Sequence, residues 1–412
     1  MNAPASPAPA SPALATATGT PAGAAPLPPW PHFDPEQVEA AAEVLRSGRI
    51  NHRTGETGGQ FEAEFARFAG VAHAGALANG TLALDLALRV LGIGPGDDVI
   101  VTPRSYMASV SSVVLAGARP VFADVDPDSQ NLTAASIEAA LTPATRAVVV
   151  VHLAGWPCDM PSIMALAEAR GLKVIEDCAQ AHGARIAGRP VGSFGHAAAW
   201  SFCQDKIMTT GGEGGMFTTD DPALWRAAWE FKDHGKRWDA MQRRDHPPGF
   251  RWLHGSFGSN WRLTEMQSAL GRVQLARMPE WTAARTRNAL RLAERLRRWP
   301  ALRVPLPGEG IEHAWYKLYA FVQPEALAAG WTRDALLPEL EAQGIPALTG
   351  SCPEIYLEAA FDGTGWRPEA RLPAAKELGE TALMFLVHPT LTDVEIDKTC
   401  TVIQQVLSDA SV

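Results

Sequence analysis

The chain has little of what marks nucleic-acid-binding or membrane-spanning proteins. Its 36 basic residues are outnumbered by 45 acidic ones, which gives a formal net charge of −9, and they form no long basic run. A nucleic-acid partner or an anionic membrane surface is therefore not expected. The sequence also contains no unbroken run of about 18 apolar residues, the length that a membrane span needs.

Cysteine and lysine are also scarce. The five cysteines are an odd number, and no two of them have C-x-x-C spacing. This disfavours a disulfide framework and a metal site, and it predicts reduced thiols in a cytoplasmic protein. Only seven of the basic residues are lysines, so a lysine within apolar or glycine-rich sequence stands out.

The remaining composition is typical of a globular protein. The chain has 412 residues, of which 46% are hydrophobic and 20% charged, enough for two domains with a sizeable core. Residues 1–29 differ, because 25 of these 29 are Ala, Pro, Ser, Thr or Gly and none is charged. We expect residues 1–29 to be a disordered tail, dispensable for folding and activity, and not a signal peptide.

Two regions with different secondary-structure patterns follow the tail. Short β-rich runs alternate with helical segments over residues 30–280, which predicts an α/β domain whose mostly parallel sheet is covered by helices. Residues 281–412 predict a smaller α+β domain with a long helix at 282–298. The expected strands are 99–102, 120–124, 147–151, 173–177 and 197–202 in the larger domain, and 318–323 and 383–388 in the smaller.

Open parallel sheets bind ligands at the carboxyl ends of their strands, and three features of the sequence fall at such ends. The first is Asn79-Gly80-Thr81, which opens a helix. Free N–H groups at a helix start bind anions, and the small Gly80 permits close approach of a ligand. A simple turn with a helix cap is the alternative interpretation.

The second feature is the segment 176–183, at the end of an apolar strand. A carboxylate there, such as Asp177, can hold a ring nitrogen protonated through a charge-assisted hydrogen bond. An ordinary helix cap is the alternative. His182 in the same segment is compatible with either a catalytic or a structural role.

The third feature is Lys206, which leaves an apolar strand and precedes a glycine-rich run at 211–215. A lysine amine can form a Schiff base with a carbonyl cofactor, and a glycine-rich turn gives that cofactor room. A P-loop is excluded because the order G-x-x-x-x-G-K-S/T is absent. A solvated surface lysine is the alternative, but a scarce lysine in this setting favours a cofactor site.

These features belong to one set of motifs. The set comprises Asn79-Gly80-Thr81, Glu176-Asp177-x-x-Gln180-x-x-Gly183, Ser201-Phe202-x-x-x-Lys206 followed by Thr-Gly-Gly-Glu-Gly-Gly, and His388-Pro389-x-Leu391-Thr392. From about residue 30 to about residue 406 the chain resembles the sugar aminotransferases of the DegT/StrS type. The resemblance implies pyridoxal 5′-phosphate as the cofactor and the fold type I architecture of such enzymes.

The resemblance also implies roles for individual residues. Lys206 would carry the cofactor, Asp177 would keep its pyridine nitrogen cationic, and Gln180 would lie beside its phenolic oxygen. The residues that the resemblance assigns to the phosphate are Gly80, Thr81 and Ser201.

Two further assignments follow from the resemblance. Tyr106 takes the place of the aromatic residue that covers the cofactor ring in relatives, although its segment is one residue shorter than the common family pattern. Asn260 matches the asparagine that reaches the phosphate bound by the neighbouring subunit. This predicts a homodimer with shared active sites.

The function that the resemblance implies is transamination from an amino acid, glutamate, to a nucleotide-linked keto-sugar, in amino-sugar biosynthesis for a polysaccharide or secondary metabolite. A sugar dehydratase on the same scaffold is one alternative, which Lys206 disfavours because such relatives carry histidine in its place. A regulatory or sensory relative without activity and a ligand-free scaffold are the others. Residues 251–254 and 313–319 are candidates for lining the sugar-nucleotide pocket.

Overall fold

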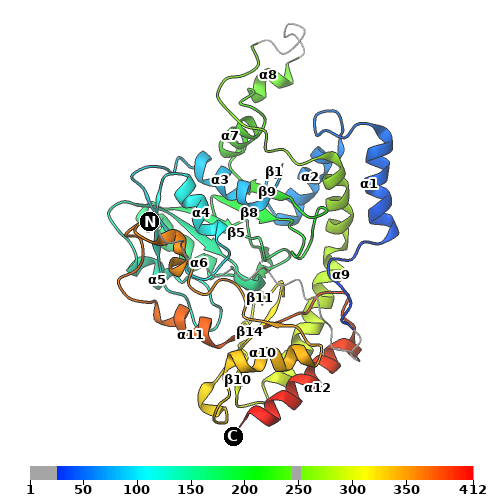
Figure 1. The fold of residues 1–412 in the computed structure, drawn as a ribbon. Coiled ribbons are helices and arrows are strands. Elements are labelled where there is room, and N and C mark those ends of the chain that lie inside the picture. The colour runs from blue at the N-terminus through cyan, green and yellow to red at the C-terminus, as the bar shows by residue number, and fades with distance from the viewer. Residues whose placement is uncertain (1–25, 244–251, 412) are drawn as a thin grey trace, which may run out of the picture.

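A seven-stranded sheet forms the centre of the larger part of the protein in the computed structural model, which describes residues 26–243 and 252–411 (Figure 1). The strand order is β1-β9-β8-β5-β4-β2-β3, and every neighbouring pair is parallel except the two that involve β9. This confirms the α/β class expected from the sequence. The strands are β1 (His73–Leu77), β2 (Asp98–Val101), β3 (Arg119–Phe122), β4 (Thr145–Val151), β5 (Lys173–Asp177), β8 (Ala197–Ser201) and β9 (Gly215–Thr219).

All five strands expected in this sheet are present, β5 with the expected bounds and the others shifted by one or two residues. The sequence analysis does not predict β1 or β9. Strand β1 reads His-Ala-Gly-Ala-Leu, with small residues in place of the β-branched ones that favour strands. Its pairing with β9 is therefore decided by packing rather than by local propensity.

Strand β4 contributes to two cores, because successive side chains of a strand point to opposite faces of the sheet. Val149 packs with the helices of one face, and Val148 and Val150 pack with those of the other. Both faces are therefore covered, as a parallel sheet requires. The covering helices are α3 (Gly80–Val90) and α4 (Ala108–Leu115) on one face, and α5 (Ala134–Ala139) and α6 (Met160–Arg170) on the other.

Helix α1 (Pro35–Ser47) shows why the sequence specifies local structure well. The Asp34 side chain caps it by accepting the Gln37 N–H at 3.1 Å, and Pro35 occupies the first turn. It ends at Gly48, which adopts the left-handed conformation with φ of 68°. Helices α1 and α2 (Thr57–Ala69) pack against α9 (Glu265–Leu296), as Figure 1 shows.

Helix α9 joins the two parts of the molecule. It begins at a capping box between Thr264 and Gln267 and continues for 32 residues past an internal proline, Pro279. The helix expected at 282–298 is thus the second half of a longer one, and the boundary expected near residue 280 falls inside it. In Figure 1, α9 runs from the side of the large sheet down to the smaller part.

The smaller part contains an antiparallel sheet in the order β10-β12-β14-β13, and α12 packs on α9 beside it. The two strands expected there are confirmed as β12 and β14. The strands are β10 (Leu302–Arg303), β12 (Leu318–Val322), β13 (Ala347–Leu348) and β14 (Ala382–Phe385), and the helices are α10 (Arg333–Ala342), α11 (Pro373–Thr381) and α12 (Asp393–Ala410).

The remaining elements are short. A three-stranded sheet of order β11-β6-β7 connects the smaller part to the loop that follows β5. Its strands are β6 (Arg185–Ile186), β7 (Arg189–Pro190) and β11 (Ile311–Glu312). The other helices are α7 (Pro222–Lys232), α8 (Trp238–Gln242) and the 3₁₀ turns η1 (Leu153–Gly155), η2 (Pro324–Ala326), η3 (Ile355–Leu357) and η4 (Ala359–Phe361).

Most of the expected tail, residues 1–25, lies outside the described residues, as does Arg251. From residue 26 the chain contacts the fold: Leu27 packs against the core of the smaller part, and the carbonyl of Pro29 accepts a hydrogen bond from Thr390 at 3.0 Å. Among the helices of residues 26–243 and 252–411, none is both long enough and apolar enough to cross a membrane.

Candidate active site

The sequence-predicted residues meet at one edge of the large sheet. Strands β1, β8 and β5 run in the same direction, since β9 is antiparallel to both β1 and β8, and β8 is parallel to β5. Asp177 ends β5, Ser201 ends β8, and Gly80 lies just beyond the end of β1. Their carboxyl ends therefore share an edge, where open parallel sheets bind ligands.

Gly80 lies directly against Ser201. A Cβ atom placed on Gly80 would come within 2.7 Å of Ser201 Cβ, so a larger residue would push the two segments apart. Gly80 and Thr81 form the first turn of α3, whose Asn79 cap accepts the Leu82 N–H at 2.9 Å. First-turn N–H groups have no partner within a helix, so this contact leaves donors beside the Ser201 hydroxyl, as a phosphate site needs.

The glycine-rich run after Lys206 packs against the chain itself. A Cβ atom on Gly214 would meet Thr210 Oγ1 at 2.0 Å, and one on Gly215 would meet the carbonyl oxygen of Asn79 at 2.3 Å. Gly214 lets the turn pack on Thr210, and Gly215 lets β9 approach the start of α3; both roles differ from the room for a cofactor expected from the sequence. Because Gly215 pairs with Ser201, its contact with Asn79 brings the start of α3 up to the end of β8.

Asp177 is buried, with 5% of its surface exposed. One carboxylate oxygen accepts the hydroxyl of Ser109 at 2.7 Å, and the other accepts the N–H of Ala179 at 3.1 Å. Burial raises the pKa of this carboxyl, and the bonds from Ser109 and Ala179 oppose the rise. The Ser109 hydroxyl also lies 2.8 Å from that of Ser105.

Gln180 and Tyr106 occupy the surroundings of Asp177. Gln180 is buried, and its side-chain oxygen accepts the Ala154 N–H at 2.7 Å, which fixes the orientation of the amide. Tyr106 lies just before α4, one helical turn from Ser109, and is 69% exposed. The sequence analysis missed Ser109, although it lies in the same segment as Tyr106 and its hydroxyl is a possible partner for a carboxylate.

Lys206 lies in the turn that follows β8. Its Nζ is 3.8 Å from Asp205 Oδ1 and 5.3 Å from the centroid of the Tyr316 ring. The Tyr316 hydroxyl donates to Asp205, and burial raises the pKa of this tyrosine well above its ordinary value. The ammonium of Lys206 is thus flanked by a carboxylate and an aromatic face, both of which favour a cation.

A second lysine, Lys317, shares the Tyr316 ring with Lys206. Its Nζ is 4.9 Å from the ring centroid, and within the described part of the chain it has no hydrogen bond or ion pair. Burial lowers the pKa of Lys317 to about 8, and the nearby charge of Arg285 contributes. The sequence analysis placed Lys317 only within the candidate lining 313–319, although the scarcity of lysine would have singled it out.

His182 lies in an aromatic core of the protein. It is fully buried among the rings of Phe65, Trp200 and Phe202, with ring centroids between 5.2 and 6.4 Å away. Neither ring nitrogen has a hydrogen-bond partner within the described residues, and burial lowers the pKa to about 3. A neutral imidazole in an aromatic core favours the structural interpretation that the sequence left open.

Asn260 is exposed, but its segment contacts the phosphate side of its own chain. Its main chain pairs with that of Asp233, and the next residue, Trp261, accepts the Ala78 N–H at 2.9 Å. This hydrogen bond places the Asn260 segment beside Ala78, which lies two residues before Gly80 in the sequence.

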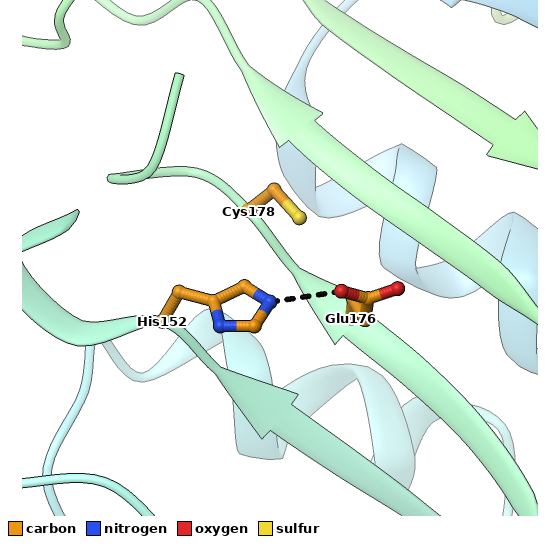
Figure 2. A group of neighbouring side chains, drawn as sticks. All are labelled: His152, Glu176 and Cys178. Carbon is orange, nitrogen blue, oxygen red and sulfur yellow. Dashed lines mark hydrogen bonds and ion pairs between the residues drawn. The ribbon is translucent and has the colours of Figure 1, made fainter. Parts of the chain in front are cut away.

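His152, Glu176 and Cys178 form a buried cluster next to Asp177, shown in Figure 2. The donor atoms lie within 4.8 Å of one another, close enough to hold a metal. However, His152 Nε2 bonds Glu176 at 3.0 Å and its Nδ1 accepts the Cys158 N–H at 3.0 Å, so both nitrogens are occupied. Burial also raises the pKa of the Cys178 thiol well above its usual range, which disfavours a thiolate ligand.

Glu176 also accepts hydrogen bonds from main-chain N–H groups of the segment 192–195. Its carboxylate accepts the N–H groups of Gly192, Phe194 and Gly195 at 2.6 to 2.8 Å. With four donors in a site that is fully buried, the charge is compensated without a metal. The network fixes the end of β5 immediately before Asp177.

Comparisons with known proteins identify the family of this chain. The family model of the DegT/DnrJ/EryC1/StrS aminotransferase family matches residues 31–404. The UDP-N-acetyl-3-dehydro-alpha-D-glucosamine 3-aminotransferase of Acidithiobacillus ferrooxidans is 38% identical over 358 residues, which cover 86% of this chain and 89% of that protein. The GDP-perosamine synthase of Caulobacter vibrioides is 38% identical over 354 residues, which cover 84% and 89% of the two chains.

A solved structure is more similar still. The aminotransferase from Psychrobacter cryohalolentis has a TM-score of 0.92 and 56% sequence identity, covering 93% of this chain and 99% of that one. The whole described fold, including the smaller part, therefore corresponds to that of an aminotransferase.

Proposed function

This chain belongs to the DegT/DnrJ/EryC1/StrS aminotransferase family, whose cofactor is pyridoxal 5′-phosphate, and we propose that it transfers the amino group of glutamate to a nucleotide-linked keto-sugar. The observation that carries this proposal is the placement of Lys206, Asp177 and the contact between Gly80 and Ser201 at one sheet edge. The product would be an amino sugar for a polysaccharide or secondary metabolite.

The residues at the sheet edge fit this cofactor. Asp177 is a buried carboxylate whose pKa is raised by burial, so a cationic ring nitrogen beside it would stabilise its charged form. The close contact of Gly80 with Ser201 places first-turn N–H groups and a hydroxyl together for a phosphate. Lys206 supplies the amine that such a cofactor binds covalently.

Asp177 and Lys206 then have distinct tasks. When bound, pyridoxal 5′-phosphate supplies an electron sink for the carbanion that forms at the donor Cα. Asp177 keeps the proton on the ring nitrogen, and Ser109 and Ala179 hold the carboxylate in place. Lys206 Nζ is the base that takes the proton from the donor Cα and delivers it to the cofactor's C4′ position.

Both proposed substrates are anionic, and the site carries cations to match. Glutamate has two carboxylates, and a nucleotide sugar has a diphosphate. Lys317 makes no hydrogen bond or ion pair in the described structure and shares the Tyr316 ring with Lys206, so it is available to such a group. The relatives act on sugars linked to different nucleotides, UDP in one and GDP in the other, so all common nucleotides are candidates here.

We also propose that the protein is a cytoplasmic homodimer in which Asn260 reaches the phosphate of the partner's cofactor. The exposure of Asn260 and the pairing of its segment beside Gly80 support a shared site at a two-fold interface. All five cysteines are unpaired thiols, which supports a reducing compartment.

The direct test is incubation of the purified protein and cofactor with L-glutamate and a panel of UDP-, dTDP- and GDP-linked keto-sugars. We expect 2-oxoglutarate to form in proportion to the amino sugar with one member of the panel. Lys206→Ala serves as the inactive control. If the cofactor is covalently bound to Lys206 but no amino donor converts it, the chain is a catalytically inactive relative and the proposal is wrong.

A further inference from the structure

Trp30, near the start of the described chain, contacts the turn that holds the catalytic lysine. Its indole Nε1 donates a hydrogen bond of 2.8 Å to the main-chain carbonyl of Lys206, across 176 residues of sequence. Neither the sequence analysis nor the comparisons assign a role to Trp30.

The ring of Trp30 is held by three side chains. Trp281 of α9 meets it edge-on at 5.0 Å, and His388 stacks on it at 6.1 Å with an interplanar angle of 19°. The guanidinium of Arg285 lies 5.0 Å from the ring centroid. Because these partners come from α9 and from the segment after β14, the indole has a fixed orientation.

Arg285 links Trp30 to the other side of the lysine turn. It is almost fully buried, and its Nη1 donates to the carbonyls of Trp315 and Tyr316, each at 3.3 Å. The Tyr316 hydroxyl in turn donates to Asp205. Lys206 is thus held by Trp30 at its own carbonyl and by Tyr316 at the side chain of the preceding residue.

The segment around Trp30 is itself anchored. Leu27 packs against the core of the smaller part, and the carbonyl of Pro29 accepts the hydroxyl of Thr390 at 3.0 Å. Residues 27–30 therefore bridge the smaller part of the protein and the turn that carries Lys206.

We propose that Trp30 is a positioning residue for the proposed reaction: its indole N–H fixes the main chain of Lys206 so that Nζ meets the donor Cα in the reactive geometry. The lysine side chain is long and flexible, so its reach is only as precise as its backbone. A displacement of about 1 Å at a reacting group can cost on the order of 100-fold in rate. The inference rests on the proposed role of Lys206.

Three proteins test it: the wild type, Trp30→Phe and Trp30→benzothienylalanine. Phenylalanine keeps an aromatic ring but lacks the donor. Benzothienylalanine keeps both rings and places sulfur where the N–H was, so it removes the hydrogen bond without leaving a cavity. Trp225→Phe is the matched control, because Trp225 Nε1 also donates to a main-chain carbonyl, that of Ala74 at 3.1 Å, at the start of β1 rather than at its carboxyl end.

The measurements are the single-turnover rate with L-glutamate, its dissociation constant, and the melting temperature. We expect both Trp30 variants to lose at least tenfold in the single-turnover rate with less than a twofold change in the dissociation constant. Their melting temperatures should fall no further than that of Trp225→Phe, which should keep the wild-type rate.

Rates within twofold of wild type for the benzothienylalanine variant would overturn the inference. So would an equal loss of rate in Trp225→Phe, because the effect would then be one of general stability. Borohydride reduction followed by mass spectrometry separates this inference from the proposed function. A wild type without cofactor on Lys206 refutes the function itself, whereas labelled wild type with fully active Trp30 variants refutes only the role of Trp30.

Discussion

Asp177 owes part of its environment to a residue that lies far from it in the sequence. Its two carboxylate oxygens are bonded to Ser109, 68 residues away, and to the nearby Ala179 N–H. These bonds orient the carboxylate but leave it without a cationic side chain bonded to it among the described residues. The cofactor nitrogen proposed to lie beside Asp177 would supply such a partner.

Asp177→Asn tests this requirement. The amide oxygen of asparagine can still accept the Ala179 N–H, and its NH2 group can donate to the Ser109 hydroxyl, so we expect the fold to be kept. Loss of the charge should weaken cofactor binding by about 1.5–3 kcal/mol, the range for hydrogen bonds to charged groups. The donor half-reaction should slow by roughly 10²–10³-fold, as when one charge-stabilising group is removed.

The measurements are a cofactor titration and the single-turnover rate with glutamate. Asp159→Asn is the control, because Asp159 is an exposed cap of α6 whose replacement keeps the capping oxygen. Near-normal turnover in Asp177→Asn would show that another acid supports the ring.

His182 gives a prediction about pH and stability. Burial lowers the pKa of His182, His313 and His388 to about 3, whereas an unfolded histidine titrates near 6.5. Between about pH 3 and 6.5 these histidines are therefore protonated in the unfolded state and neutral in the folded state. Stability is complete above about pH 6.5 and is lost as the pH falls toward 3, by up to about 1.4 kcal/mol per pH unit for each histidine.

His182→Phe should remove one third of this dependence. The new ring would join Phe65, Trp200 and Phe202, and no hydrogen bond to His182 is lost within the described residues. Urea unfolding at several pH values between about 4 and 6 measures the slope. An unchanged slope would mean that His182 does not titrate on unfolding, and lost activity in a stable variant would restore its catalytic interpretation.

At the scale of elements, the turn between β8 and β9 and the start of α3 depend on each other. Gly215 begins β9, and a Cβ atom there would come within 2.3 Å of the Asn79 carbonyl and 2.7 Å of the Gly80 nitrogen. Both neighbours are backbone atoms, which cannot move aside as a side chain can. The position of the first turn of α3, the proposed phosphate site, is therefore set by a glycine of β9.

Gly215→Ala should accordingly displace the start of α3. We expect a loss of stability of about 1–3 kcal/mol, typical of overpacking, together with weaker cofactor binding. Gly59→Ala is the control, because Gly59 lies within α2 with open space at its Cβ position, and it should gain about 0.5–1 kcal/mol. Thermal unfolding and cofactor titration measure both, and wild-type cofactor affinity in Gly215→Ala would contradict the coupling.

At the scale of the whole molecule, the proposed shared site makes the dimer the active unit. If Asn260 serves the partner's phosphate, mixing the inactive variants Lys206→Ala and Asn260→Asp creates hybrid dimers with one site that has both defects and one that has neither. We expect activity to return toward half the wild-type value per hybrid dimer. Continued inactivity in a mixture where hybrids demonstrably form would show that Asn260 serves its own chain or has no such role.

The sequence by itself determined the features that arise within a few residues. The cap at Asp34 with the stop at Gly48, the apolar strand β5 and the placement of Asp177 and Lys206 at strand ends all follow from local patterns. Capping, apolar periodicity and the geometry of a parallel sheet act over one or two turns or one strand, so neighbouring residues suffice to specify them.

Only the tertiary structure decided the contacts between distant segments. It placed Ser109 on Asp177, brought Gly215 into contact with Asn79, and extended the helix expected at 282–298 into the longer α9. It also brought Trp30 to the carbonyl of Lys206. Such contacts depend on how whole elements pack, and a single side chain carries no local signal of a partner 68 or more residues away.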